Sequence, residues 1–367
     1  MKKPSKFNRL LRTINGPFSL GRTPVFWLCL ALVVGYLFAY PKIATRYDVI
    51  NLTYFISWTF VAMGLSLIWG CGNILSFGQM AFVGIGGYAY GVIAINTIGA
   101  TGNTVLALVG GVVIPFLVAA LLGYFVFYGR VSGVYVSIMT LVFTLVLETF
   151  MEQTGGSQWR IGKAVLGGYN GMTNIPPITF GTPGASTALK GASLYYFAMI
   201  LMVVIYLFLR FLVNSRYGVG LIATGSNPER TEVLGYDTRL IQLIAFAIAG
   251  GLAGLTGVLY VAWGHYITPS TMGLTNASLP VIWVAVGGRK SVLGSIIFAI
   301  LLQYFTQFLA VTGSEYALIV LGALLLMIVM YMPEGVLPPI FRWLGGLGSK
   351  KNKSVVAGAE PRGGANA

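Results

Sequence analysis

Charged residues are scarce in this chain of 367 residues, because Asp, Glu, Lys and Arg together make up only 9% of it. Soluble domains carry about 25% charged residues. The shortage excludes an ordinary water-soluble protein, since most of the chain must be sheltered from water. Acidic residues are the scarcer charge, with 9 against 23 basic residues. The basic residues lie at the chain ends and in short loops rather than in one patch, which excludes a nucleic-acid partner.

Histidine and cysteine are also rare, and this limits the chemistry that the chain can perform. His265 is the only histidine, so a histidine-based metal cluster is excluded. Cys29 and Cys71 lie in or beside apolar runs, where we expect two small buried hydrophobic residues rather than a disulfide or a metal site. A membrane-embedded enzyme would need clustered His, Asp or Glu inside the spans, and the best pair is Glu148 with Glu152. The sequence therefore predicts no metal site and no enzyme.

Long apolar runs recur from residue 24 to residue 332. Runs of this length predict an all-α polytopic membrane protein. The first run lacks an A-x-A cleavage site, so we expect a retained helix rather than a signal peptide. About ten membrane segments are expected, at residues 24–40, 49–70, 74–98, 103–127, 133–150, 193–213, 240–263, 278–288, 291–311 and 315–332.

One of these segments, 278–288, is too short to cross a hydrocarbon core of about 30 Å at about 1.5 Å per residue. We expect half a helix, broken by Gly287 and Gly288 and shielded by its neighbours, because broken backbone at membrane depth must face protein or a wet cavity. Pro280 lies near the predicted start of this segment, and proline suits a helix N-terminus.

The distribution of Lys and Arg predicts the orientation of the chain. If the N-terminus is cytoplasmic and every segment crosses in turn, the inner side holds 18 basic residues and the outer side 5. This bias predicts a cytoplasmic basic N-terminus (1–23), a transmembrane domain (24–340) and a flexible cytoplasmic tail (341–367). The domain would carry a long outer loop at 151–192 and a cytoplasmic loop at 214–239.

The cytoplasmic loop contains the signals of a short amphipathic helix. Ser226 and Asn227 precede Pro228, which suits a cap followed by the first helical position, and Gly235 suits the end of a two-turn helix. Val233 and Leu234 would form an apolar knob among charged side chains. We expect this helix to contact a partner, the alternative being a solvated connector.

The outer loop contains a sequence, GSQWRIGKA, that is superficially similar to a phosphate-binding loop. It has five residues between its glycines instead of four, and Ala164 stands where Ser or Thr should hold magnesium. We therefore expect no nucleotide or other cofactor in this chain.

Five blocks of sequence resemble the permease subunits of branched-chain amino acid ABC importers, over roughly residues 50–335. The likeness is closest to the second of the two paired permeases. The blocks are SLIWGCGNILSFGQMAFVGIGGYAYG, GRVSGVYVSIMTLVF, GGYNGMTNIP, RYGVGLIATGSNPERTEVLGYDTRLIQLIAFAIAGGLAGLTGVLY and VIWVAVGGRKSVLGSIIFAILLQ.

The resemblance implies a bacterial inner membrane protein that works with several partners. ATP and magnesium would bind to separate ATP-binding cassette subunits, a second related permease would complete the pore, and an extracytoplasmic binding protein would deliver the substrate. The loop at 228–237 corresponds to the coupling helix that docks into the ATPase. Its docking positions would be Glu229, Arg230, Glu232 and Gly235.

The substrate stays open between two branches of this family. Branched-chain or other neutral amino acids are one class, and urea or short-chain amides are the other. RVSGVYVSI and GGYNGMTN look at least as much like the urea and amide branch, but Gln79 and Met80 stand where that branch usually has His-Gly. A stand-alone channel or carrier is a further alternative, although it would not need the charged inner loop.

Glu148 is a candidate substrate contact, because an acidic residue near the bilayer is costly and often functional. It would meet the ammonium group of an incoming amino acid. The alternative is that Glu148 and Glu152 lie in the wet outer boundary or pair with Arg160 or Lys163.

Polar and small residues within residues 73–91 fall on one side if the whole stretch is helical. Ser76, Gln79, Gly86, Gly87 and Tyr90 belong to this stripe. It would either allow close helix packing or line the translocation path, and the sequence leaves both open.

A second run of small residues lies near the centre of the segment at 240–263. Gly250, Gly254 and Gly257 are spaced by four and three residues, and Gly251 lies beside them. This spacing predicts close helix packing.

Overall fold

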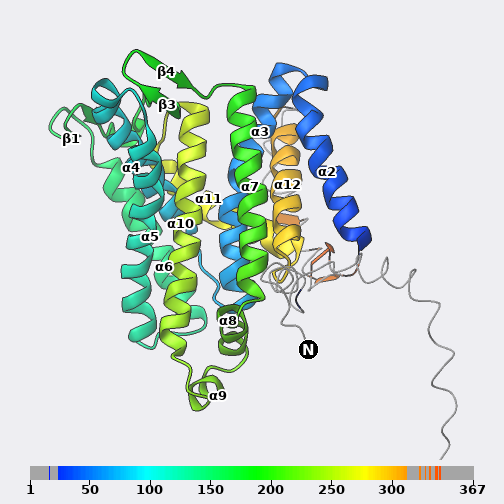
Figure 1. Ribbon diagram of the computed structural model, residues 1–367. Helices are drawn as coiled ribbons and strands as arrows, with labels where there is room; N and C mark the ends of the chain where they lie inside the picture. Colours follow the sequence, from blue (N-terminus) through cyan, green and yellow to red (C-terminus); the bar gives the residue numbers. More distant parts are fainter. Residues whose placement is uncertain are drawn as a thin grey trace, which may run out of the picture.

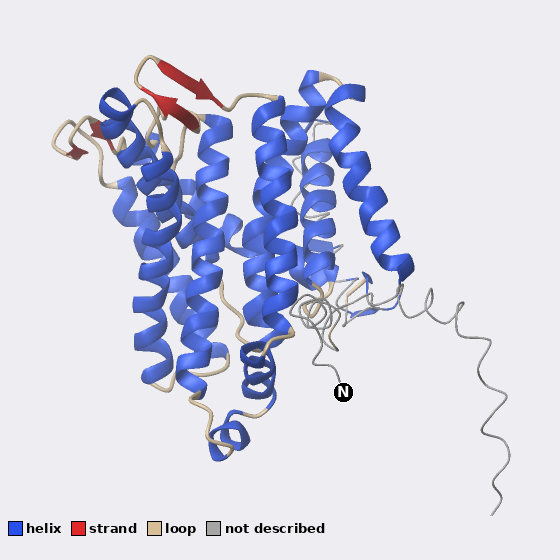
Figure 2. Cartoon of the chain, viewed as in Figure 1, coloured by secondary structure: helices blue, strands red, loops and turns tan. Residues whose placement is uncertain are grey.

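The computed structural model describes residue 16, residues 24–311 and the scattered positions 322, 323, 327, 330, 331, 335–337 and 339. Helices form most of it, and eight of those in the described residues are long and apolar enough to cross a membrane. Figure 2 shows these helices as a bundle with short strands at one end. The prediction of an all-α polytopic membrane protein is confirmed.

The helices follow one another with short connections, except for the long loop between α6 and α7 (Figure 1). Their bounds are α2 Pro24–Ile43, α3 Arg46–Leu65, the π-helix η1 Ser66–Cys71, α4 Gln79–Thr101, α5 Val105–Tyr128, α6 Val134–Glu152, α7 Ala192–Val213, α8 Arg216–Ser226, α9 Pro228–Val233, α10 Thr238–Gly264, α11 Leu274–Gly287 and α12 Val292–Val311. Two short 3₁₀ helices lie in the loops: η2 Gly168–Asn170 is in the loop between α6 and α7, and η3 Pro269–Met272 connects α10 to α11. Nine of the ten expected segments thus correspond to helices, and the tenth, 315–332, lies outside the described residues apart from scattered positions.

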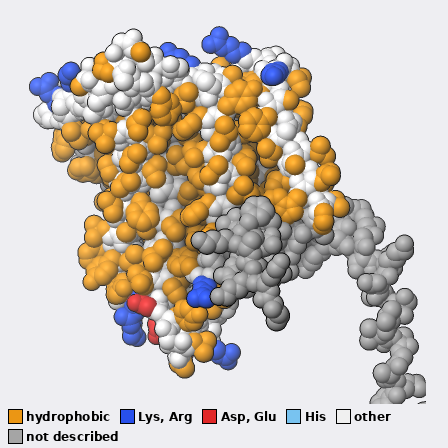
Figure 3. Space-filling model, in the orientation of Figure 1, with side chains coloured by type: hydrophobic (Ala, Val, Ile, Leu, Met, Phe, Trp, Pro, Cys, Tyr) orange, Lys and Arg blue, Asp and Glu red, His pale blue; other side chains and the backbone are white. Residues whose placement is uncertain are grey.

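Opposite ends of the bundle carry different structures. The predicted outer loop forms two antiparallel hairpins, β1 Arg160–Ile161 with β2 Ala164–Val165, and β3 Thr179–Thr182 with β4 Ala185–Ala188. The helices α8 and α9 lie at the other end (Figure 1). Hydrophobic side chains cover the band between these ends, and Lys and Arg gather at both ends (Figure 3). This surface matches a protein whose middle lies in lipid and whose ends meet water.

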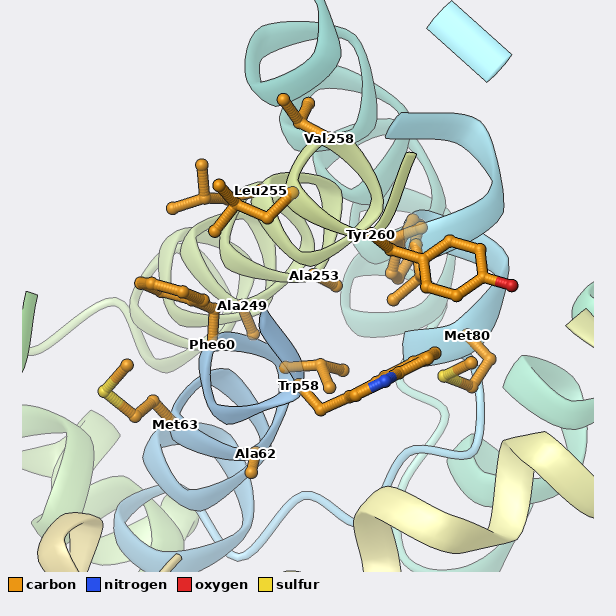
Figure 4. Close-up of a cluster of buried hydrophobic side chains, with 14 of the residues drawn as sticks. Trp58, Phe60, Ala62, Met63, Met80, Ala249, Ala253, Leu255, Val258 and Tyr260 are labelled. Atoms are coloured by element: carbon orange, nitrogen blue, oxygen red, sulfur yellow. The ribbon is translucent and has the colours of Figure 1, made fainter. Parts of the chain in front are cut away.

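The core lies where α3, α4, α5 and α10 pack together, with α3 and α10 almost completely buried. Figure 4 shows the side chains of this core, among them Trp58, Phe60, Ala249 and Tyr260. Thr256 of α10 accepts a hydrogen bond from the backbone N–H of Val61 across a distance of 3.0 Å. Because lipid tails supply little hydrophobic driving force between helices, close packing and such bonds hold the core together.

The small residues of α10 make this close packing possible. A Cβ at Gly254 would lie 2.6 Å from the carbonyl oxygen of Gly111 and would overlap Pro115 on α5. A Cβ at Gly257 would overlap the carbonyl oxygen of Val83 on α4. The prediction that these glycines serve helix packing is confirmed.

Valine at Gly257 should therefore destabilise the bundle, because its nearest neighbours are backbone atoms of α4 that cannot move aside. We expect a loss of about 1–3 kcal/mol, as for other overpacked cores, measured as a lower thermal unfolding midpoint in detergent. Gly35→Val on α2 is the matched control, since nothing lies within 4 Å of its Cβ position. An unchanged midpoint in Gly257→Val would contradict this packing role.

Two predictions about helix limits are wrong. The segment expected from residue 74 is not helical until Gln79, because Asn73 is left-handed with φ of 55° and the chain runs irregularly through residues 72–78. We call residues 72–78 the broken segment. Pro280 lies inside α11 rather than near its start, since α11 begins six residues earlier at Leu274.

The expected half-helix itself is present. With 14 residues, α11 is about 21 Å long, which is less than the hydrocarbon core of about 30 Å. It ends at Gly287, and Gly288 has φ of 98°, a backbone conformation that residues other than glycine rarely adopt. The N-terminal region 1–23 and the tail 341–367 lie outside the described residues, apart from Gly16.

Candidate functional site

The short helix predicted in the cytoplasmic loop is present as α9. The side chain of Asn227 accepts a hydrogen bond from the backbone N–H of Arg230 at 2.9 Å, which caps the helix. Thr231 is buried and donates from Oγ1 to the carbonyl oxygen of Asn227 at 2.8 Å. Gly235 follows the helix with φ of 87°, as expected of a glycine that ends a helix. This part of the sequence prediction is confirmed.

The α9 helix presents an apolar knob with charges around it. Val233 is 87% exposed and Leu234 is 74% exposed, at an end of the molecule outside the apolar band. Glu229 and Arg230 are also exposed. Glu232 is exposed and accepts a hydrogen bond from Thr238 Oγ1 at 2.7 Å, so it also ties α9 to the start of α10. Exposed apolar side chains on a rigid, capped helix are typical of a protein interaction site.

The helix α8 connects α9 to the bundle. Ser215 caps its start by accepting from the backbone N–H of Gly218 at 3.3 Å. Tyr217 donates its hydroxyl to the carbonyl oxygen of Ile241 on α10 at 2.8 Å, and burial raises the pKa of this phenol. The Tyr217 bond therefore ties the start of α8 to α10.

The far end of α8 lies directly against the broken backbone. A Cβ at Gly225 would lie 2.5 Å from the carbonyl oxygen of Cys71 and 2.7 Å from the carbonyl carbon of Gly72. A Cβ at Gly72 would lie 3.1 Å from Cδ1 of Leu221. The exposed helix α9 is therefore linked through α8 to the end of η1 and the start of the broken segment.

Hydroxyl groups of α6 hold the broken segment. Ser137 donates to the carbonyl oxygen of Leu75 at 2.9 Å, and Thr140 accepts from the backbone N–H of Phe77 at 3.2 Å. Thr144 donates to the carbonyl oxygen of Phe77 at 3.4 Å. The sequence reading missed these three residues, although their spacing of three and four places them on one face of a helix.

Ser76 and Gln79 lie at the junction of the broken segment with α4, rather than along one helix as expected. Ser76 precedes α4, is fully buried and accepts from the backbone N–H of Gly78 at 3.1 Å. Gln79 is the first residue of α4 and is 1% exposed. Neither atom of its side-chain amide has a hydrogen-bond partner in the structure.

The other residues of the predicted stripe lie deeper in the bundle. A Cβ at Gly86 would lie 2.5 Å from Cα of Gly254, and a Cβ at Gly87 would lie 3.0 Å from Cγ2 of Val261. Tyr90 is buried and donates its hydroxyl to the carbonyl oxygen of Pro176 at 3.0 Å. The structure thus separates the stripe into residues at the broken segment and residues packed against α10 and the outer loop.

Glu148 lies near the outer end of α6, beside the start of α11. Its Oε1 atom would be 2.7 Å from a Cβ built on Gly273, the residue that caps α11. A carboxylate is favoured at a helix N-terminus by the exposed N–H groups there. This neighbour is different from the Arg160 and Lys163 considered from the sequence.

Comparison with known proteins identifies the fold and the general role. The family described as "Branched-chain amino acid transport system / permease component" matches residues 47–329. The chain belongs to this family. This permease is therefore a multi-pass membrane subunit of an importer, and the resemblance seen in the five sequence blocks is confirmed.

The permease is similar to several proteins of known name. It is 25% identical to the high-affinity branched-chain amino acid transport system permease protein LivM of Escherichia coli K12, covering 90% of this chain and 81% of that protein. It is 27% identical to the ribose import permease protein RbsC of the same strain, covering 74% of this chain and 80% of that protein. The galactofuranose transporter permease protein YtfT is 24% identical, covering 65% and 69% respectively. No solved structure matches the permease.

Proposed function

We propose that this permease is the transmembrane subunit of an ATP-driven importer that moves branched-chain or other neutral amino acids across the bacterial inner membrane. The observation that carries the proposal is the rigid α9 knob joined through α8 to the broken segment. A stand-alone carrier would not need such an exposed helix. Similarity to LivM over 90% of the chain supports amino acids, whereas similarity to RbsC leaves sugars as a competing substrate class.

The proposed assembly has four kinds of component. ATP-binding cassette subunits bind ATP and magnesium and dock on α9, where Glu229, Arg230, Glu232 and Gly235 surround the apolar knob. A second, related permease completes the pore, and an extracytoplasmic binding protein delivers substrate to the hairpin end. Both termini of the permease are cytoplasmic, on the same side as α9.

The proposed coupling route follows the contacts between these elements. Displacement of α9 by the ATPase moves α8, because both are short helices joined only by Asn227. The α8 helix then presses on Cys71 and Gly72 through Gly225. Because Leu75 and Phe77 are bonded to α6, the broken segment and α6 shift together.

Transport by the reconstituted assembly tests the proposed function. We expect ATP-dependent uptake of labelled leucine into proteoliposomes that contain the permease, its ATPases and its partner permease, with the binding protein added outside. Labelled urea and ribose serve as competing substrates, and uptake of either in place of leucine would contradict the substrate class. Uptake by this chain without ATPases would instead indicate a stand-alone carrier.

Glu148 is proposed to attract the ammonium group of the substrate near the outer end. Glu148→Gln should lower leucine uptake by roughly two- to fivefold, because an ion pair in a partly hydrated site contributes about 0.5–1 kcal/mol. The measurement is the initial rate of uptake at subsaturating substrate. Glu152→Gln, one turn along α6, is the matched control, and equal rates for wild type and Glu148→Gln would remove this role.

A further inference from the structure

The amide side chain of Gln79 is an unusual feature of the permease core. It is 1% exposed, and neither Nε2 nor Oε1 has a hydrogen-bond partner in the structure. An unpaired amide in a low-dielectric interior is costly, and native proteins keep such groups where something else satisfies them. The position of Gln79 indicates what this partner is.

Gln79 is the first residue of α4, a helix of 23 residues whose cap, Gly78, makes no side-chain capping bond. The backbone N–H groups just before it are occupied, since Thr140 accepts from Phe77 and Ser76 accepts from Gly78. Among the described residues, no acceptor is found for the N–H groups of Gln79 and Met80. Unoccupied donors therefore remain at the end of α4 itself.

The side chain of Gln79 leaves the backbone on the same side as these donors. The Cα–Cβ bonds of a helix tilt toward its N-terminus, so the side chain of the first residue projects beyond the end of the helix. The buried, unpartnered amide of Gln79 therefore belongs to the same end of α4 as the free N–H groups, without bonding to them. The end of α4 thus offers several donors and, in Oε1, one acceptor within the buried core.

We propose that this end of α4 binds the α-carboxylate of the transported amino acid, with Oε1 of Gln79 accepting from its ammonium group. Helix N-termini bind carboxylates through free N–H groups and the helix dipole, and broken helices at membrane depth provide such ends inside transporters. A neutral sugar or urea has no carboxylate to place there. The proposal rests on the proposed function and specifies its substrate class.

The site is closed in this conformation, because Ser76 and Gln79 are both buried. Access requires the broken segment to move away from α6, where Thr140 and Thr144 hold Phe77. The contact of Gly225 with Cys71 and Gly72 supplies a route by which the ATPases would produce that movement. The site would therefore be occupied only during part of the transport cycle.

Substitution of Gln79 in the complete reconstituted importer tests the site. We expect Gln79→Leu, which keeps the size and removes the amide, to lower leucine uptake about tenfold, the effect of losing hydrogen bonds to a charged group. Gln79→Glu should lower it similarly by repelling the carboxylate. Both variants should still co-purify with the ATPases, which separates loss of the site from loss of assembly. Tyr88→Phe is the matched control, because it removes another buried, unpartnered polar atom from α4.

Full uptake by Gln79→Leu would overturn the proposal, because the amide would then play no part in binding the substrate.

A labelling experiment on the wild-type assembly tests the same site if the variants fail to assemble. A photoreactive leucine with a diazirine side chain should label residues 72–82 of this chain. Unlabelled leucine should compete with this labelling, whereas 3-methylbutylamine, which lacks only the carboxylate, should not. Labelling elsewhere in the chain, or equal competition by both compounds, would overturn the site. Absence of leucine uptake in the wild type would contradict the proposed function instead.

Discussion

Aspartate at both Val233 and Leu234 should abolish binding of the ATPase subunits to the permease. These side chains are 87% and 74% exposed, and they form the only large apolar projection of α9. Burying two carboxylates in place of two apolar anchors removes the hydrophobic contact and adds unpaired charges to the interface. We expect the affinity to fall about a hundredfold or more, measured by co-purification and by titration of the ATPase in detergent or nanodiscs.

The same double substitution should leave the fold intact, because neither side chain packs in the core. The matched control is Val165→Asp, which changes a 47% exposed valine in a hairpin at the opposite end. It should leave ATPase binding unchanged. Normal binding by the α9 double variant would place the docking surface elsewhere and would remove the main support for the proposed coupling route.

Valine at Gly225 should uncouple ATP hydrolysis from transport. A side chain there would collide with Cys71 and Gly72, so α8 could no longer lie against the start of the broken segment. Because α9 stays capped and exposed, the ATPases should still bind and hydrolyse ATP at close to the basal rate. We expect leucine uptake to fall about a hundredfold, since both the contact and its geometry are lost.

Gly220→Ala provides the control for this experiment on the same helix. Its Cβ would lie 3.3 Å from Cδ1 of Ile241, a flexible side-chain end that can move. Uptake by this variant should stay near the wild-type rate. If Gly225→Val transported normally, or if it lost ATPase binding as well as transport, α8 would not be the element that passes movement to the broken segment.

Local chemistry explains why parts of the site could be predicted from the sequence. The α9 helix was predicted because Asn227, Pro228 and Gly235 act within a few residues of one another. The glycines of α10 were predicted as packing residues because small residues at helical spacing have few other uses in a membrane. Long apolar runs predicted the spans because the length of each run can be compared directly with the thickness of the bilayer.

The broken segment could not be predicted in this way. It contains the apolar residues Ile74, Leu75 and Phe77, and the groups that satisfy its backbone, Ser137 and Thr140, lie more than sixty residues along the chain on α6. Without those partners an irregular stretch at membrane depth would be excluded, so a continuous helix was the reasonable expectation. The start of α11 was misplaced for a related reason, because Pro280 is tolerated inside a helix when neighbouring helices shield the freed carbonyl.

The sequence by itself determined that the chain is a polytopic membrane protein with a capped helix at Pro228–Val233, because span length and caps are local properties. Only the tertiary structure decided that Ser76 and Gln79 lie at the end of α4 rather than along it, and that Gly225 abuts the backbone before them. These relations depend on which segments pack together. Hydropathy cannot encode them, because the buried α10 and the more exposed α6 have nearly the same mean hydropathy, 2.0 and 1.9.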